Sequence, residues 1–291
     1  MTTAGGRSHA REEDLQRIRM FRLLDDDFMT KCFEGDPACA ELVLRIILEK
    51  PDLYVTEVHT QVFLVNLLKR SVRLDVLAVD GMGRKYDIEI QRDDRGAGQR
   101  RARFNSSMMD AKWTEKGTDF EDIPDTYTIF ITENDVLGKG RPVSHIERCI
   151  VEDSQLFDDG AHILYVNGAY RGDSPIGKLM HDFSCTDAAD MHYKALADRV
   201  RFFKESKEGN AIMCKMLEDM CAESYREGEK IGIQKGEQIG IQKGEQIGIQ
   251  KGEWKKAIET ARCMLTDGEL RPEAIARYSG LSLEEVLSLR Q

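Results

Sequence analysis

A glycine turn between two extended apolar stretches constrains the fold of this chain more than any other feature. Residues 72–80 and 84–91 both have the composition of strands, and Asp80-Gly81-Met82-Gly83 joins them. Such a turn between apolar stretches is typical of a β-hairpin. If its last three residues form the loop, Asp75 lies directly across from Glu89, with β-carbons about 5 Å apart.

Strand alternation divides the second arm of this hairpin into two faces. Tyr86, Ile88 and Ile90 are expected to point into a core, while the residues between them point to the opposite face. That second set is Lys85, Asp87, Glu89 and Gln91. We interpret Asp87 as a solvent-facing residue paired with Lys85. A loop one residue longer or shorter would destroy the alignment, and the facing acids would then be residues of a solvated strand face.

Two facing carboxylates repel each other, and a divalent cation between them removes the repulsion. Hard oxygen ligands favour Mg²⁺ or Mn²⁺, which can activate a water for attack on phosphorus. Gln91 follows Glu89 by two residues and would reach the same cluster. Its amide can hydrogen-bond a water or a phosphate oxygen but cannot take a proton at neutral pH.

The charge distribution limits where a nucleic acid could bind. The 291-residue chain has a formal net charge of -10, so any contact with DNA must come from a local basic patch. The most basic segment directly follows the hairpin and contains Arg92, Arg95, Arg100, Arg101 and Arg103. We predict phosphate contacts there. The alternative is a solvated helix with internal ion pairs.

Cysteine usage and hydropathy indicate the compartment. The seven cysteines are scattered and form no CxxC pair, which argues against a disulfide framework and against a zinc site. We found no apolar stretch of roughly 18 residues that would span a membrane. These features predict a cytoplasmic protein, without a membrane partner or a nucleotide cofactor, since a GxxxxGK[ST] loop is also lacking.

The chain divides into four segments by composition. Residues 1–24 are a lead, disordered at its start, followed by a charged helix; residues 25–228 mix helical and strand-like stretches; residues 229–253 are a repeat; and residues 254–291 form a small helical module. Within the second segment, Asp36-Pro37 is a strong helix start, and residues 126–132 and 162–168 are strand-like. We predict an α/β fold with a mixed sheet flanked by helices and a helical C-terminal extension.

The repeat carries IGIQKGE three times, with glycine at every fourth position from Gly232 to Gly252. Each glycine disfavours a helix by about 1 kcal/mol relative to alanine, so we expect a weak helix or a flexible spacer. A seam for a homo-oligomer is the alternative. The C-terminal module has a helix–turn–helix rhythm, and Ser282 and Glu285 form a capping box that opens its last helix.

Taken together, these residues resemble the PD-(D/E)XK nuclease superfamily, and most closely its family of PD-(D/E)XK transposases, or recombination-promoting nucleases. The resemblance covers roughly residues 25–291. It rests on DDDFMTKCF, RLDVLAVDGMGRKYDIEIQ, RRARFNSSMMDAKW and KGTDFEDIPDTYTIFI in that order, followed by the glycine repeat and the short helical end.

The resemblance implies a restriction-endonuclease-like core. Asp75 and Glu89 match the metal-binding acids, and Gln91 matches a position that is usually lysine in the superfamily but tends to be glutamine in this group. An acidic residue on the first core helix often completes such a site, and Glu41 is the candidate. The chain departs from the superfamily pattern in having Leu74 before Asp75 and in Gln91 itself, which removes a positive charge near the reacting phosphate.

The expected function is therefore a Mg²⁺- or Mn²⁺-dependent endonuclease that hydrolyses DNA phosphodiester bonds. The alternative from another class is a catalytically degenerate nuclease-fold protein that binds DNA or protein. RNA cleavage is a second enzymatic alternative.

Overall fold

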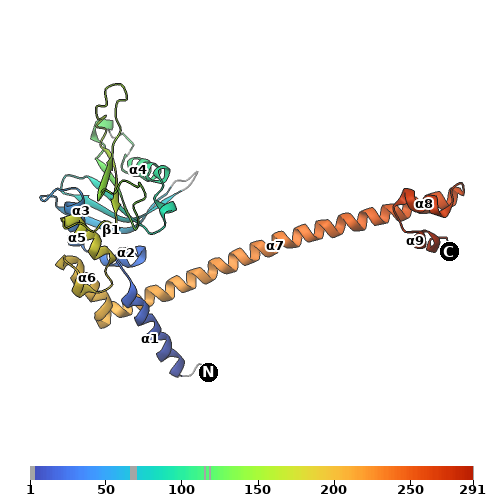
Figure 1. Ribbon diagram of the computed structural model, residues 1–291, viewed down its shortest axis with the longest axis horizontal. Coiled ribbons are helices and arrows are strands. Elements are labelled where there is room, and N and C mark those ends of the chain that lie inside the picture. Colours follow the sequence, from blue (N-terminus) through green and yellow to red (C-terminus); the bar gives the residue numbers. More distant parts are fainter. Residues whose placement is uncertain (1–3, 66–70, 115, 118, 291) are drawn as a thin grey trace. The chain divides into compact units, whose positions relative to one another are not determined.

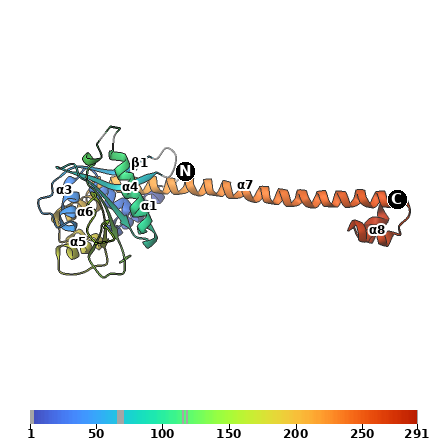
Figure 2. The same ribbon diagram turned by 90° about the horizontal axis from the view of Figure 1, so that it is seen from above.

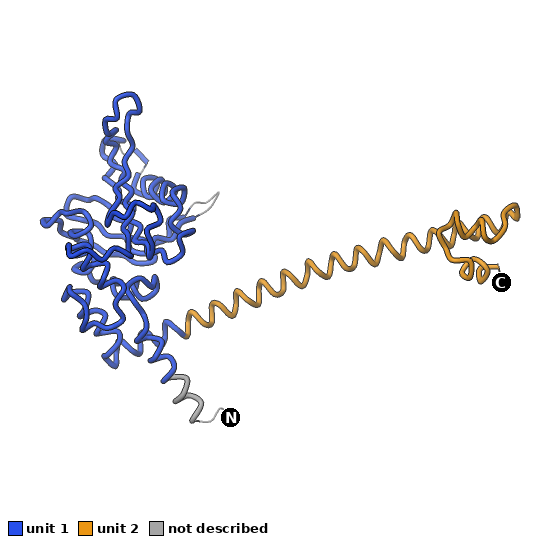
Figure 3. The backbone as a smooth tube through the Cα atoms, in the orientation of Figure 1, with its two compact units in different colours: residues 1–217 blue, residues 218–291 orange. Residues whose placement is uncertain are grey.

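The computed structural model describes residues 4–65, 71–114, 116–117 and 119–290, and the side chains among them from residue 12 onward. The chain separates into two compact units, Met1–Leu217 and Glu218–Gln291 (Figure 3). The predicted mixed α/β class is confirmed: the first unit holds a mixed sheet flanked by helices.

Within the described residues, the strands form one sheet of six in the order β1-β2-β3-β4-β6-β5 (Figure 1). β3, β4 and β6 run parallel to one another, while the pairs β1–β2, β2–β3 and β5–β6 are antiparallel. The strands are β1 (Val55–Leu64), β2 (Val72–Asp80), β3 (Lys85–Gln91), β4 (Thr126–Thr132), β5 (Val143–Ile146) and β6 (Ala161–Asn167).

The β2–β3 hairpin has the register predicted from the sequence. Asp80 N–H bonds the Arg84 carbonyl at 3.2 Å, and Gly83 takes a φ of 84° that favours glycine. The Asp80 carboxylate fixes this turn by accepting from the backbone N–H groups of Met82 and Arg84 and from the hydroxyl of Tyr86. A turn held at this many points sets the pairing of every residue further along both strands.

Helices cover both faces of the sheet, as Figures 1 and 2 show. The face with Tyr86, Ile88 and Ile90 forms the main core with α2 (Asp26–Phe33), α3 (Pro37–Ile47), α5 (Pro175–Ser184) and α6 (Lys194–Glu205). α4 (Gln99–Trp113) packs on the opposite face through two smaller apolar clusters. α3 begins as predicted, since Asp36 caps it and Pro37 is its first residue.

The N-terminal segment differs from the prediction of a disordered start. A helix, α1, runs over Ala4–Met20, and residues 1–3 lie outside the described part. Ile18 near its end is fully buried in the main core. Tertiary packing of this apolar end against α6 stabilises a helix that the polar composition of its start disfavours.

The second unit is helical. α7 (Lys207–Asp267) begins in the first unit and continues without a break through the repeat, whose residues are all exposed. Near the end of the chain, α8 (Pro272–Ser279) and α9 (Leu283–Ser288) pack on the last turns of α7, with Gly280 in a left-handed conformation between them. The predicted Ser282–Glu285 capping box is present. Among the described helices, we found none long and apolar enough to cross a membrane.

Candidate active site

Asp75 and Glu89 lie where the β2–β3 ladder ends. The last paired residues are Val76 and Ile88, so the next step in the same register sets Asp75 opposite Glu89, as the sequence predicted. Here, the carboxylates replace the ladder: Asp75 N–H donates to Glu89 Oε1 at 3.4 Å, and Ile90 N–H donates to Asp75 Oδ2 at 3.2 Å. The two side chains therefore hold the diverging strands together.

Both carboxylates are removed from water. Glu89 is 0% exposed and Asp75 5% exposed, which rules out the solvated strand face as the setting of these acids. Burial of a charged carboxylate without a matching cation is strongly unfavourable. The pair therefore needs positive charge, protonation or a bound cation to be stable.

Asp87 is buried rather than exposed, so our interpretation of it as a solvent residue paired with Lys85 is wrong. Its exposure is 0%, and neither of its oxygens has a hydrogen-bond partner of good geometry within the described part of the chain. Alternation does place it on the face of Glu89, as expected, but α4 covers that face there and excludes water. Its polar neighbours are Glu89 and Asn105, and the buried Asn105 amide nitrogen likewise has no hydrogen-bond partner of good geometry among the described residues.

Burial dominates the titration of this cluster. It raises the pKa of Asp75 to about 8, with further contributions from the charges of Glu89 and Asp26. Burial also raises the pKa of Glu89, although the Arg101 guanidinium partly offsets the effect. The pKa of Asp87 lies well above its ordinary value because of burial first and the neighbouring acids second. The cluster therefore holds more negative charge than its surroundings stabilise.

Arg101 brings a positive charge to this site from α4. Its Nη2 donates to Glu89 Oε2 at 3.0 Å, and its Nη1 donates to Gln91 Oε1 and to the Gly96 carbonyl, both at 3.1 Å. Gly96 leaves room for this arrangement, since a β-carbon there would lie 1.9 Å from Gln91 Oε1. Gln91 is therefore held next to Glu89 by Arg101, whose guanidinium is ion-paired with Glu89.

A cavity of about 910 Å³ opens beside these groups. Acidic and basic side chains both line it, the acids being Asp26 and Asp75 and the bases Arg73, Arg95, Arg100 and Arg101; Gln91, Phe104 and Asn105 add to the wall. Asp26 at the start of α2 is close enough to raise the pKa of both Asp75 and Glu89. The cavity thus combines acidic and basic groups in one lining.

Glu41 is not brought to this cavity. Its Oε2 accepts from Val55 N–H at 3.0 Å, and its Oε1 pairs with Arg45 at 2.7 Å. It joins α3 to the start of β1, so the prediction that Glu41 lies with Asp75 and Glu89 is wrong. Asp26 on α2 lines the cavity instead. The run of three acids at residues 25–27, directly before an apolar helix, was the available sequence signal.

The five predicted DNA-contacting arginines divide into two groups. Arg95, Arg100 and Arg101 line the cavity. Arg92 instead pairs with Asp25 at 2.8 Å and with Glu133 at 3.3 Å, and Arg103 is exposed on α4 away from the cavity lining. Arg73, which our sequence reasoning missed, also lines the cavity from β2, the strand that carries Asp75.

The donor set suits a hard divalent cation. Carboxylate oxygens of Asp75, Glu89 and Asp26 and the amide oxygen of Gln91 are oxygen ligands of the kind that Mg²⁺ and Mn²⁺ prefer. Asp87 lies beside Glu89, and its buried oxygens have no hydrogen-bond partner of good geometry among the described residues. The chemistry of these donor groups therefore suits the metal that the resemblance implies.

Comparisons of the chain with family models, with curated proteins and with solved structures gave no match.

Proposed function

We propose that this protein is a metal-dependent endonuclease that hydrolyses DNA phosphodiester bonds on a restriction-endonuclease-like core. One observation carries the proposal: Asp75 and Glu89 face each other, buried, beside a cavity that Arg73, Arg95, Arg100 and Arg101 also line. The acids suit a cation, and the arginines suit the phosphates of a nucleic acid.

Asp75 and Glu89 would hold the metal, with Asp26 as the third carboxylate. A bound Mg²⁺ or Mn²⁺ lowers the pKa of a coordinated water and neutralises charge that develops on a phosphate. Gln91 would orient that water or a phosphate oxygen through its amide, since it can neither lose nor accept a proton at neutral pH. Its position is fixed by Arg101.

Arg101 supplies the charge that Gln91 lacks. Where a lysine side chain at position 91 would place a cation beside the reacting phosphate, here the Arg101 guanidinium lies against both Glu89 and Gln91. A side chain that is 41% exposed can turn from Glu89 toward a phosphate in the cavity. Arg73, Arg95 and Arg100 would neutralise neighbouring phosphates and so position the strand.

The ion pair between Arg101 and Glu89 also favours a second function. If Arg101 permanently takes the place of the metal on Glu89, the cavity binds DNA without cutting it, as a degenerate nuclease would. Plasmid cleavage distinguishes the two. Purified protein should nick supercoiled DNA with Mg²⁺ or Mn²⁺ and not with EDTA, and Glu89→Gln should abolish nicking. DNA binding without metal-dependent nicking by the wild type would establish the degenerate alternative instead.

A further inference from the structure

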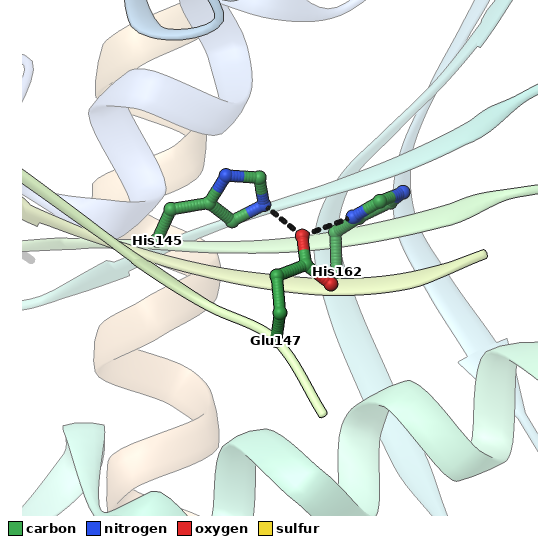
Figure 4. Close-up of side chains that lie close together, drawn as sticks. All are labelled: His145, Glu147 and His162. Atoms are coloured by element: carbon green, nitrogen blue, oxygen red, sulfur yellow. Dashed lines mark hydrogen bonds and ion pairs between the residues drawn. The ribbon is translucent and has the colours of Figure 1, made fainter. Parts of the chain in front are cut away.

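The edge of the sheet formed by β5 and β6 gathers two histidines and a glutamate on one face. His145 pairs with Leu164 and Ile146 with Ile163, so the next step in this register sets Glu147 opposite His162. Residues 145 and 147 lie on the same side because strand residues alternate. Figure 4 shows the three side chains pointing toward one another.

The ligand atoms of this cluster are already close together. His145 Nε2 lies 2.6 Å and His162 Nδ1 lies 2.5 Å from Glu147 Oε1. One ligand atom from each of the three residues lies within 4.8 Å of the other two. Four-coordinate zinc with bonds of about 2.0–2.2 Å separates its ligands by roughly 3.3 Å. A small outward rotation of the side chains would therefore admit an ion in place of the two hydrogen bonds.

The neighbouring side chains hold part of the cluster in place and leave part of it open. The His162 ring stacks on Tyr127 with centroids 4.2 Å apart, and Tyr127 stacks in turn on the buried Tyr86 at 4.8 Å. This stack of three rings, one each from β6, β4 and β3, fixes the orientation of the His162 imidazole. The His145 side chain is 47% exposed, whereas those of Glu147 and His162 are 20% and 17% exposed. Solvent therefore reaches the ligands from the His145 side.

We propose that His145, Glu147 and His162 bind a first-row transition-metal ion of the Zn²⁺ type. Two imidazole nitrogens and one carboxylate oxygen suit Zn²⁺ and disfavour Mg²⁺ or Ca²⁺, which prefer oxygen ligands alone. Three protein ligands leave a fourth position for water or for a ligand from solution. The lack of cysteine pairs argued against any zinc site, and this proposal reverses that expectation with ligands that include no thiolate.

This site is separate from the candidate active site. His162 is aligned with Tyr127 and Tyr86 on the core-facing side of the sheet, whereas alternation along β3 puts Glu89 on the α4 side. The proposed zinc site does not depend on nuclease activity. Either the zinc site or the nuclease function can therefore be disproved without affecting the other.

A second cluster, His181, Asp182 and His192, has a similar composition but a structural explanation. Asp182 is fully buried, and its carboxylate already accepts from the backbone N–H groups of His192 and Tyr193, both at 2.8 Å, and contacts His192 Nδ1 at 2.9 Å. These bonds tie the segment after η3 (Ala188–Asp190) to α5. Because the Asp182 carboxylate is engaged in this way, His192 serves as the matched control.

Calorimetric titration of the full chain with ZnCl₂ tests the proposal. Free thiols are first alkylated so that exposed cysteines do not bind zinc, and excess Mg²⁺ is present to occupy the Asp75–Glu89 site. We expect one Zn²⁺ per chain in the wild type. His145→Ala should weaken binding more than the roughly 10- to 100-fold that loss of an outer-shell partner typically costs. Glu147→Gln should weaken it as well. His192→Ala should bind as the wild type does, and so should His59→Ala, which removes an exposed histidine of β1 that pairs with Glu57.

Thermal melts of the same proteins provide a second measurement. Zn²⁺ should raise the Tm of the wild type and of His192→Ala but not that of His145→Ala, since an ion that binds only the folded state stabilises it. His145 is half exposed, so its removal should leave the fold intact even if His162→Ala, which removes a stacked ring, does not fold. Wild-type affinity in His145→Ala and Glu147→Gln, or no zinc binding by the wild type, would overturn the proposal.

Discussion

The carboxylates of Asp75 and Glu89 are joined reciprocally across the hairpin, because each accepts a backbone N–H from the strand that carries the other. The backbone pairing of β2 and β3 stops at Val76 and Ile88. Beyond that point, hydrogen bonds from the two carboxylates connect the strands. This arrangement positions two buried acids without placing a neutralising group between them. The first prediction below follows from that imbalance of charge.

The first prediction concerns stability and pH in the absence of metal. The pKa of Asp75 is raised to about 8 in the folded protein, against about 3.9 in an unfolded chain. The folded state therefore binds the extra proton, and stability falls as the pH rises from about 4 to about 8. Asp75→Asn, which keeps an acceptor for Ile90 N–H, should flatten this decline and raise apo stability at pH 8.5 by a few kcal/mol. Denaturant melts at pH 5.5 and 8.5 measure both effects, and parallel pH profiles would contradict them.

The second prediction concerns Arg101. It contacts Glu89 and Gln91, while Arg103 on the same helix is exposed outside the cavity lining. Removing one preorganised hydrogen-bond donor that stabilises charge in a transition state costs about 10²- to 10³-fold in kcat. Arg101→Gln should therefore reduce DNA cleavage by about that factor, and Arg103→Gln should leave it unchanged. Equal losses in the two variants would mean that α4 acts only through its overall charge.

The third prediction separates Asp26 from Glu41. Asp26→Asn should abolish or greatly reduce cleavage, because it removes a cavity carboxylate near Asp75 and Glu89. Glu41→Ala should instead lower the free energy of unfolding by about 1–3 kcal/mol, since Val55 N–H and Arg45 lose their partner. Its cleavage rate per folded molecule should match the wild type. Cleavage lost in Glu41→Ala and kept in Asp26→Asn would restore the assignment made from the sequence.

The fourth prediction concerns the repeat in α7. Its residues are exposed throughout, and a β-carbon added at any glycine from Gly232 to Gly252 would meet nothing within 4 Å. Deleting residues 231–253 should therefore leave the Tm of the first unit within a few degrees of the wild-type value. Calorimetry of both proteins measures it. A lost or broadened cooperative transition in the deletion variant would show that the repeat packs against something that stabilises the fold.

The hairpin was predictable because its information is local. The number of residues in the Gly81–Gly83 loop sets the register, and the register alone brings Asp75 opposite Glu89. The helix start at Asp36 and the capping box at Ser282 are local in the same sense, since each depends on a few adjacent residues. These features were all confirmed.

The rest of the site depends on contacts between distant segments. Nothing near Asp87 in the sequence indicates that α4 will cover it and exclude water. In the same way, Asp26 reaches the cavity only because α2 packs beside β2 and β3. Glu41 also lies on an early helix, as we expected of an acid that completes the site. The packing of α3, however, places its carboxylate against Val55 N–H. Sequence spacing does not determine which helix face meets the sheet.

Calorimetric titration with Mn²⁺ tests the central claim most directly, namely that Asp75 and Glu89 share a divalent ion. Wild-type protein at neutral pH should bind Mn²⁺ at this site, and Asp75→Asn and Glu89→Gln should each reduce the affinity by more than tenfold while remaining folded. His145→Ala is the control that removes the separate site on β5, and it should retain this binding. Undiminished Mn²⁺ binding by the double variant Asp75→Asn/Glu89→Gln, or no binding by the wild type, would contradict the account.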